Sequence, residues 1–419
     1  MSSPLESLPK VVLKPRRAQP FFARHPWVFS GAIARFEGEP QPGSEVALVT
    51  EHGEFVARGL FNAQSNIQVR LYSWDAIVPL DEAFWSERLD EAIRLRRGVL
   101  GLTGPAGTGS LATGADSARP GSACRLVFSE ADGLSGLVVD RYGDWLSIQL
   151  TSLALASRKD LLTRLLNDKL APAGIWLRTE RGIRAAEGLD IADGLLCGAV
   201  PPRPLCIEEH GLCYAVDIVE GQKTGFFLDQ RDNRLEAARY VRPGGRVLDL
   251  CCYTAGFAMN AARHGAASEV LAVDVSEPAL TTARANVAAN GLTQTIRFEK
   301  SDAFKALEAL RAAGERFDLV VLDPPKLARH GRGIDEALRG YHSLNRMALE
   351  VLAADGILVT CSCTGYVERQ MFEDMLADAA RSAKRRMQIL EVRGAAADHP
   401  TSVACKETDY LKCYIGRVF

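Results

Sequence analysis

Acidic side chains recur at the ends of short apolar segments in the second half of this 419-residue sequence. Asp249, Asp274 and Asp302 each lie at, or just beside, the end of such a segment. A carboxylate at the end of a strand can accept hydrogen bonds from ribose hydroxyls or from an adenine amino group. One such aspartate is often structural, but three on successive segments predict a site for a nucleotide-like cofactor.

The turn Cys251-Cys-Tyr-Thr-Ala-Gly256 follows the first aspartate and precedes a helical pattern. Small residues there let backbone N–H groups approach a ligand carboxylate. The turn lacks the spacing Gly-x-Gly-x-x-Gly, so by itself it is weak evidence for a nucleotide-binding fold. The candidate cofactor residues of this turn and of the next two strand ends are Tyr253, Thr254, Gly256, Ser276 and Ala303.

The string Asp323-Pro-Pro-Lys326 follows a fourth apolar segment and separates two classes of enzyme. Dinucleotide-dependent dehydrogenases share the first half of the pattern but lack this string. Asp/Asn-Pro-Pro at this place is typical of S-adenosylmethionine (SAM)-dependent enzymes that methylate bases or amines, because two prolines fix a rigid rim beside the methyl group. The string therefore predicts SAM as the cofactor, with Asp323 in both the cofactor and the catalytic set.

Cys361 and Cys363 follow the fifth apolar segment, and their chemistry bears on the type of methylation. A base nitrogen needs only an acceptor for its proton, whereas C5 of a pyrimidine becomes nucleophilic only after a thiolate adds to C6. Because side chains alternate along a strand, we expect both thiols to face the cofactor cleft. Cys251 and Cys252 are expected to be structural.

Strand and helix patterns alternate after Pro201 and predict a doubly wound, mostly parallel α/β sheet of the class I SAM-dependent methyltransferase type. Ligands of such sheets bind at the carboxyl ends of the strands, where the candidate residues lie. The expected strands are 246–250, 269–274, 296–300, 319–322 and 356–360. The expected helices are 257–264, 277–290, 303–313, 334–352 and 365–383.

The N-terminal half is organised differently. Four short β-rich segments separated by turns predict a small β-barrel, and a helix is expected over 81–100; the segments are 11–13, 45–49, 55–61 and 67–72. The Gly/Ala/Thr/Ser tract 101–121 is expected to be a mobile loop. A hairpin turning at 142–144, a helix over 157–170 and a strand over 174–178 follow. The expected domains are a barrel (1–80), a central α/β domain (81–205) and a cofactor-binding domain (206–419).

Composition is that of a globular protein, with 47% hydrophobic residues and a net charge of −2. No apolar run approaches the roughly 20 residues that cross a bilayer, and the N-terminus lacks the layout of a signal peptide, so we expect a cytoplasmic location. Ten cysteines without Cys-x-x-Cys spacing favour reduced thiols and no metal site. Residues 7–36 carry six basic side chains and no acidic one, a stripe that either holds phosphates or is merely solvated.

Three longer strings give the sequence a family resemblance. They are Glu130-Ala-Asp-Gly-Leu-Ser-Gly-Leu-Val-Val-Asp-Arg141, Asp217-Ile-Val-Glu-Gly-Gln-Lys-Thr-Gly-Phe-Phe-Leu-Asp-Gln-Arg-Asp-Asn-Arg234 and Ala396-Ala-Asp-His-Pro400. The second is the most specific, since so long a polar string has no evident packing reason to recur. Nearly end to end, the chain resembles the bacterial 23S ribosomal RNA cytosine-5 methyltransferases of the large-subunit methyltransferase I type.

This resemblance implies an RNA-binding PUA domain near 11–73, SAM as cofactor, and 23S rRNA as the partner. It also implies methylation at C5 of a cytosine through a covalent adduct between a cysteine and C6. The Ser-Cys-Ser/Thr-Gly motif of the family matches Ser362-Cys-Thr-Gly365, which makes Cys363 the nucleophile and Cys361 the second choice. Asp323 would bind the N3/N4 edge of the cytosine. Relatives of this type can form homodimers, although nothing in the sequence demands one.

Three positions depart from the pattern of the family. Cys251 and Ala255 replace a phenylalanine and a glycine of the cofactor turn, and an alanine is expected to fit only with a negative φ. Lys326 stands where other RNA cytosine-5 methyltransferases carry a cysteine that helps to release the product. That role is open between Cys361, a bound water and Lys326.

The segment 222–231 precedes the first strand of the cofactor domain and is expected to cover the cofactor. Phe226 is placed near adenine, while Gln230 and Arg231 are placed at the methionine carboxylate. An equally simple role for Arg231 is a salt bridge within its own helix.

Two rival functions remain. Guanine-N methyltransferases on the same scaffold carry asparagine at the end of the fifth strand, so Cys363 argues against that activity. A catalytically inert rRNA-binding assembly factor would have no need for an intact set of site residues. That set is Asp249, Asp274, Asp302, Asp323 and Cys363.

Overall fold

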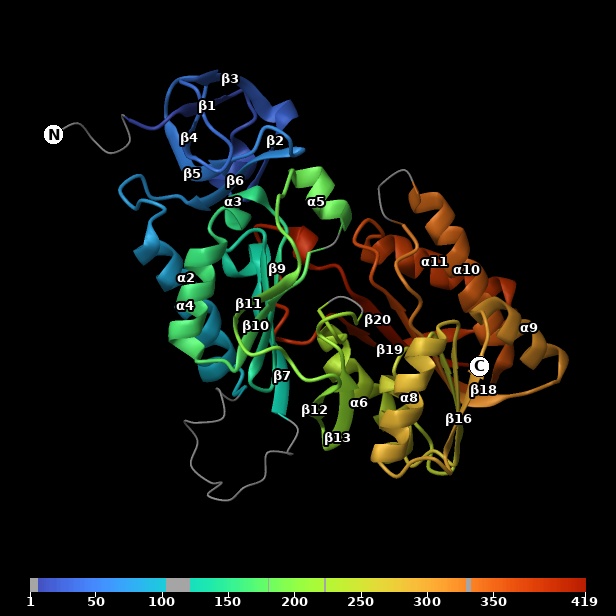
Figure 1. Cartoon of the computed structure of the whole chain (residues 1–419). Helices are drawn as coiled ribbons and strands as arrows, with labels where there is room; N and C mark the ends of the chain where they lie inside the picture. Colours follow the sequence, from blue (N-terminus) through green and yellow to red (C-terminus); the bar gives the residue numbers. More distant parts are fainter. Residues whose placement is uncertain (1–6, 103–120, 180, 222–223, 329–332) are drawn as a thin grey trace. The chain divides into compact units, whose positions relative to one another are not determined.

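The computed structural model describes residues 7–102, 121–179, 181–221, 224–328 and 333–419 (Figure 1). The chain divides into two compact units. The first consists of Met1–Ile207, Val216–Leu228 and Ala397–Thr408, and the second of Glu208–Ala215, Asp229–Ala396 and Asp409–Phe419. Within the described ranges, every helix is too short or too polar to traverse a lipid bilayer.

The N-terminal part of the first unit is a curled six-stranded sheet in the order β2-β6-β5-β4-β1-β3 (Figure 1). Its strands are β1 (Lys10–Leu13), β2 (Trp27–Phe29), β3 (Ile33–Glu37), β4 (Glu45–Val49), β5 (Phe55–Phe61) and β6 (Ile67–Ser73). Apolar side chains from all six strands form one core. The sequence predicts four of these strands; β2 is very short, and β3 buries only Ile33, so neither shows a clear alternation.

A second sheet follows in the order β11-β10-β9-β8-β7-β12-β13. Its strands are β7 (Gly121–Phe128), β8 (Leu137–Tyr142), β9 (Trp145–Leu150), β10 (Gly174–Leu177), β11 (Gly194–Gly198), β12 (Leu205–Glu209) and β13 (Leu212–Val216). The expected hairpin is confirmed, since Tyr142 pairs with Trp145 across the β8–β9 turn. β12 and β13 belong to this sheet although they lie at the expected boundary near residue 206.

Two helices of this part were expected and are present: α2 (Glu82–Arg94), extended by a π-helical turn over Leu95–Val99, and α4 (Lys159–Leu170). Asp81 begins α2 by accepting a hydrogen bond from the N–H of Phe84, the usual role of an N-cap. The mobile loop expected over 101–121 lies outside the described residues except at its ends.

The polar strings that carry the family resemblance have a packing role after all. Arg125 forms two 2.7 Å hydrogen bonds with the carboxylate of Asp140, and the hydroxyl of Thr224 donates to the same carboxylate. Asp398 accepts a 2.9 Å hydrogen bond from the backbone N–H of Arg125. Asp140, Thr224 and Asp398 each come from a different one of the three strings, and all three are buried. The strings therefore meet in one buried hydrogen-bond network around Arg125.

The second unit contains a sheet in the order β16-β15-β14-β17-β18-β20-β19. Its strands are β14 (Arg246–Leu250), β15 (Glu269–Asp274), β16 (Ile296–Lys300), β17 (Phe317–Leu322), β18 (Leu352–Ser362), β19 (Met387–Arg393) and β20 (Lys412–Val418). The first five strands in that order are parallel, as the sequence predicts, whereas β20 and β19 add an antiparallel pair that the sequence analysis does not include.

A helix follows each of the five parallel strands of this sheet. They are α7 (Gly256–Arg263), α8 (Glu277–Ala289), α9 (Ala303–Ala312), α10 (Ile334–Val351) and α11 (Arg369–Ser382); α6 (Arg231–Arg239) precedes β14. Four of the five connecting helices match their expected ranges closely. The fifth, α11, starts four residues later than expected, because the backbone over 364–367 is bound by a lysine from β20 instead of continuing as a helix.

Candidate active site

The register of the parallel strands brings the candidate residues to one edge of the sheet. Leu250 is paired with Val273 on one side and with Leu322 on the other, and Leu322 is paired with Thr360. Asp323 directly follows Leu322, and β15 ends with Asp274. The carboxyl ends of these strands therefore meet, as expected for the ligand site of a doubly wound sheet.

Asp249 is the most deeply buried acidic residue of this edge, with 1% of its surface exposed. Its Oδ2 accepts a 2.9 Å hydrogen bond from the N–H of Ala258 in α7, while Oδ1 has no hydrogen-bond partner among the described residues. Burial raises the pKa of this carboxyl to about 8, and the carboxylates of Asp323 and Asp274 act in the same direction. A cationic or hydroxyl-bearing ligand would relieve this unfavourable setting.

Asp274 ties the cofactor turn to the second strand. Its Oδ2 accepts from the N–H of Tyr253 at 2.9 Å, and its Oδ1 accepts from the N–H of Ser276 at 2.8 Å. The expectation of a negative φ at Ala255 is wrong: φ is +68°, and Cys251 and Tyr253 are also left-handed, with φ of 59° and 50°. Such conformations cost free energy and persist where the surroundings over-determine them, as a buried turn held by hydrogen bonds does.

Gly256 is the first residue of α7, and a close neighbour leaves no room there for a side chain. A Cβ at this position would lie 2.6 Å from Cδ of Arg234, which forms a buried ion pair with Glu209 at 2.6 Å. The glycine thus lets the start of α7 approach α6, and its contact with the cofactor stays a prediction.

Ser276 and Asp302 both begin helices. The hydroxyl of Ser276 accepts from the N–H of Ala279 in α8. Asp302 Oδ1 accepts from the N–H groups of Phe304 and Lys305, so it caps α9 and is exposed. Ala303 is the first residue of α9. These contacts give a structural role to each residue, and the adenine contact of Asp302 stays a prediction.

Asp323 is partly buried beyond the end of β17, where its Oδ2 accepts a 3.1 Å hydrogen bond from the amide of Gln230. Arg231 contacts Asp232, its neighbour in α6, at 3.2 Å, which is the simpler of the two roles considered for it. Phe226 is buried but belongs to the first unit, whereas the strand-end residues belong to the second. Lys326 is exposed.

The two cysteines of the fifth strand have different environments. Cys361 lies within β18, is fully buried and is paired with Cys413 of β20. A hydrogen bond with Cys413, together with burial, raises the pKa of the Cys361 thiol. β18 ends at Ser362, so Cys363 lies beyond the strand and is partly exposed. The expected alternation therefore does not extend to Cys363, and the two thiols are not equivalent.

Lys412 is a residue of this site that the sequence analysis misses. The residue is 2% exposed, and its ammonium group donates to the carbonyl oxygens of Thr364 (2.9 Å), Val367 (2.7 Å) and Tyr410 (2.9 Å). Burial lowers the pKa of Lys412 to about 8, and the charge of Cys363 acts in the opposite direction. The lysine thus fixes the loop that follows Cys363 and places a cation near that thiol. A buried lysine at the start of an otherwise apolar strand was the available signal.

The donor set suits SAM. Asp249 Oδ1 and the hydroxyl of Thr254 are buried and have no hydrogen-bond partner among the described residues, although buried polar atoms are normally satisfied. Asp249 lies near the end of β14, and Thr254 lies in the turn that follows it. Their groups are available for the amino, carboxylate or hydroxyl groups of a cofactor.

Comparison with known proteins identifies the class. Residues 189–401 match the family model of S-adenosylmethionine-dependent methyltransferases, and residues 11–74 match that of a PUA-like domain. The protein is therefore a SAM-dependent methyltransferase with an N-terminal PUA-like domain, which confirms the fold class and the cofactor expected from the sequence.

The particular family follows from full-length relatives. "Ribosomal RNA large subunit methyltransferase I" of Shewanella denitrificans is 40% identical over 98% of this chain and 99% of its own length. The protein of the same name from Photobacterium profundum is 41% identical over 94% of this chain and 96% of its own length. The chain belongs to the ribosomal RNA large subunit methyltransferase I family, as the resemblance indicated.

Solved structures share the fold. A protein from Streptococcus mutans described as a SAM-dependent methyltransferase aligns with a TM-score of 0.80 at 20% identity, covering 97% of this chain and 99% of its own. A structure described as a methyltransferase in complex with SAH aligns with the same TM-score, identity and coverage.

Proposed function

We propose that this enzyme methylates C5 of a cytosine in 23S ribosomal RNA, with Cys363 as the nucleophile. The observation that carries the proposal is the position of Cys363, a partly exposed thiol just beyond the end of β18, next to the strand that leads to Asp323 and within electrostatic reach of the buried Lys412. The names of the relatives support ribosomal RNA as the substrate.

The cofactor would be held by Asp249, Thr254, Asp274 and the backbone N–H groups of the turn before α7. SAM, when bound, supplies an electrophilic methyl group. The remaining work falls to the residues of the chain, which must exclude water, position the base and make C5 nucleophilic.

Cys363 would perform the covalent step. Its thiolate adds to C6 of the cytosine, and the electron pair of the C5–C6 double bond makes C5 nucleophilic. Once C5 is substituted, a base removes the C5 proton, the C5–C6 double bond re-forms, and the sulfur leaves as thiolate. Because Lys412 is cationic, it favours the thiolate both before the attack on C6 and when the sulfur leaves.

Asp323 would accept a hydrogen bond from the exocyclic amine of the cytosine. The amide of Gln230, which donates to Asp323 Oδ2, would keep the carboxylate in place. A bound water would receive the C5 proton, assisted by the exposed Lys326. Cys361 is less suited to that role, because its hydrogen bond to Cys413 and its burial raise the pKa of its thiol.

The N-terminal barrel would bind RNA. The basic side chains of Lys14, Arg16 and Arg24 are exposed, and so are the rings of Phe22 (44%) and Phe29 (47%). Cations that contact phosphates and rings that stack on unpaired bases are the usual means of binding single-stranded RNA. The target cytosine must leave its stack to reach Cys363, which is easiest in a loop. A ribosomal RNA substrate also implies action in the cytoplasm.

Mass spectrometry of nucleosides tests the proposal. Purified enzyme, SAM and protein-free 23S rRNA are expected to give 5-methylcytidine. RNA containing 5-fluorocytosine at the target should remain covalently attached through Cys363, because fluorine cannot leave C5 as a proton does. Methylguanosine as the product would replace the proposal with the guanine-N rival, and absence of SAM binding in calorimetry would favour the inert assembly factor.

Two coarser expectations belong to the same proposal. The three-domain division 1–80, 81–205 and 206–419 is tested by limited proteolysis of the full chain. The homodimer implied by the resemblance is tested by light scattering, with a monomeric mass as the contrary result.

A further inference from the structure

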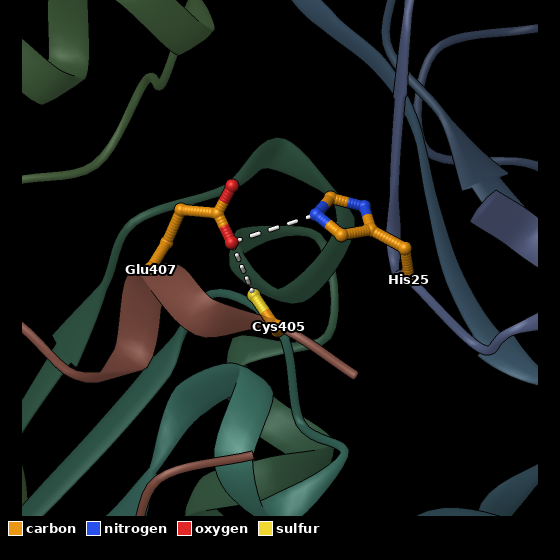
Figure 2. Close-up of side chains that lie close together, drawn as sticks. All are labelled: His25, Cys405 and Glu407. Carbon is orange, nitrogen blue, oxygen red and sulfur yellow. Dashed lines mark hydrogen bonds and ion pairs between the residues drawn. The ribbon is translucent and has the colours of Figure 1, made fainter. Parts of the chain in front are cut away.

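Three side chains of different chemistry meet in the first unit, outside the residues discussed so far (Figure 2). His25 precedes β2, while Cys405 directly precedes a short 3-10 turn over Lys406–Thr408 that contains Glu407. His25 Nε2 lies 3.5 Å from Glu407 Oε2, and Cys405 Sγ lies 3.4 Å from the same oxygen. The three ligand atoms all lie within 4.8 Å of one another.

We propose that His25, Cys405 and Glu407 bind a divalent cation of intermediate softness, of which Zn²⁺ is the best fit. An imidazole nitrogen, a thiolate and a carboxylate are the three kinds of protein ligand found at zinc sites. A tetrahedral ion with bonds of about 2.0–2.3 Å keeps its ligands roughly 3.3–3.6 Å apart. Two of the three separations already have such values, and a water molecule would complete the coordination.

The turn that presents Cys405 and Glu407 is fixed by its own hydrogen bonds. The hydroxyl of Thr408 donates to the carbonyl of Cys405 at 2.7 Å and accepts from the N–H of Ser402 at 2.9 Å. The N–H of Cys405 donates to the carbonyl of Ser402 at 3.1 Å. Two of the ligands are therefore held in place before any ion arrives, which reduces the conformational entropy lost on binding.

The local charge favours a cation. Cys405 is 1% exposed, and its sulfur lies 3.4 Å from the carboxylate oxygen of Glu407. A carboxylate beside the sulfur attracts a metal ion. On binding, the Cys405 S–H bond breaks, the proton goes to solvent and the sulfur coordinates as thiolate.

One contact opposes binding. His25 Nδ1 accepts a hydrogen bond of 3.3 Å from the N–H of Trp27, so the neutral ring carries its proton on Nε2, facing Glu407. Coordination through Nε2 moves that proton to Nδ1 and breaks the contact with Trp27. The bond is long, so its loss is a small cost beside three metal–ligand bonds. Without an ion, Glu407 simply accepts from both neighbours, and a test must separate these two states.

Cobalt provides a direct readout of sulfur coordination. The full chain, stripped of metal by a chelator, is titrated with Co²⁺ and then with Zn²⁺. We expect a sulfur-to-cobalt charge-transfer band that saturates at one ion per chain and is displaced by Zn²⁺. Cys405→Ser should abolish the band, and the matched control Cys206→Ser, which removes an exposed thiol elsewhere, should retain it.

Glu407→Gln is the second variant, because the Glu407 side chain is half exposed and its replacement should leave the fold intact. It should weaken Zn²⁺ binding by more than the roughly 10- to 100-fold that loss of an outer-shell partner costs. Absence of saturable binding to the wild-type chain, or binding that both Cys405→Ser and Glu407→Gln leave unchanged, would overturn the proposal and leave a metal-free hydrogen-bonded cluster.

Discussion

Cys363 and Cys405 are two thiols in opposite electrostatic settings. Cys363 lies beyond the end of β18, beside a loop held by the ammonium group of Lys412. Cys405 lies on a turn beside Glu407, and the charge of Glu130 also acts on its thiol. A nearby cation favours a free thiolate, whereas nearby carboxylates keep a thiol protonated until a metal ion displaces the proton.

The contrast shows why the type of residue alone does not assign a role. Both residues are cysteines in a chain with ten of them, and neither belongs to a Cys-x-x-Cys pair. What differs is the sign of the charge that the fold places nearby. Under the two proposals made above, that charge suits Cys363 to nucleophilic attack and Cys405 to metal binding.

Replacement of each cysteine by alanine gives the largest expected difference in methylation rate between the two regions. Cys363→Ala should lower formation of 5-methylcytidine by at least roughly 1,000-fold, because the other thiol, Cys361, is fully buried and hydrogen-bonded to Cys413. Cys405→Ala should keep the rate within about 3-fold of wild type, since it is outside the proposed chemistry. Single-turnover methylation with excess enzyme measures both; a Cys363→Ala enzyme that still makes 5-methylcytidine would end the assignment.

Removal of the cation beside Cys363 should have the next largest effect. Lys412→Met deletes three hydrogen bonds to carbonyl groups and the positive charge, so kcat should fall by roughly 10- to 100-fold. Lys412→Arg keeps the charge and should recover part of that loss. Equal activity of Lys412→Met and wild type would mean that the lysine only stabilises the loop.

The pH dependence sharpens this test, since burial lowers the pKa of Lys412 to about 8. Asp409 and Cys363 raise that pKa, while Arg369 and Lys326 lower it. Above about pH 8, Lys412 loses a proton, and the neutral amine has only two N–H groups for three carbonyls. It also loses the positive charge that favours the Cys363 thiolate. We therefore expect kcat/KM to decline above about pH 8 in wild type but not in Lys412→Arg, since arginine stays charged. Between pH 8 and the unfolded value near 10.4, the unfolded state binds more protons, so stability should rise with pH while activity falls.

Sequence periodicity and strand-end chemistry predict most of the cofactor-binding fold. β14, β15 and β16 have the expected bounds. For β14 and β15 the reason is that buried parallel strands are continuous apolar runs, whereas the edge strand β16 is mostly exposed. The antiparallel pair β19 and β20 escapes prediction, since β19 is largely exposed and shows little apolar pattern. Sequence spacing also could not reveal Lys412 beside the Cys363 loop, or His25 beside Cys405, because both contacts are made by residues far apart in the chain.

Alkylation compares the two thiols directly. With a small excess of iodoacetamide near neutral pH, Cys363 should react at least roughly 10-fold faster than Cys405, because the thiolate is the reactive form and Cys405 is both buried and protonated. Peptide mass spectrometry at short times gives both rates in one sample. Faster labelling of Cys405 would contradict the electrostatic contrast on which both assignments depend.

The smallest effect is expected at Glu407 when no metal is present. The side chain is half exposed, and glutamine keeps an oxygen that can accept from Cys405 and His25, so Glu407→Gln should change the free energy of unfolding by less than about 1 kcal/mol in chelator. Zinc should then stabilise the wild-type chain and leave Glu407→Gln almost unaffected, because only an ion bound to the folded state shifts the equilibrium. If each protein has the same unfolding midpoint in chelator and in zinc, the carboxylate beside Cys405 only accepts hydrogen bonds and binds no metal. Of the contrast between the two thiols, only the effect of Lys412 on Cys363 would then remain.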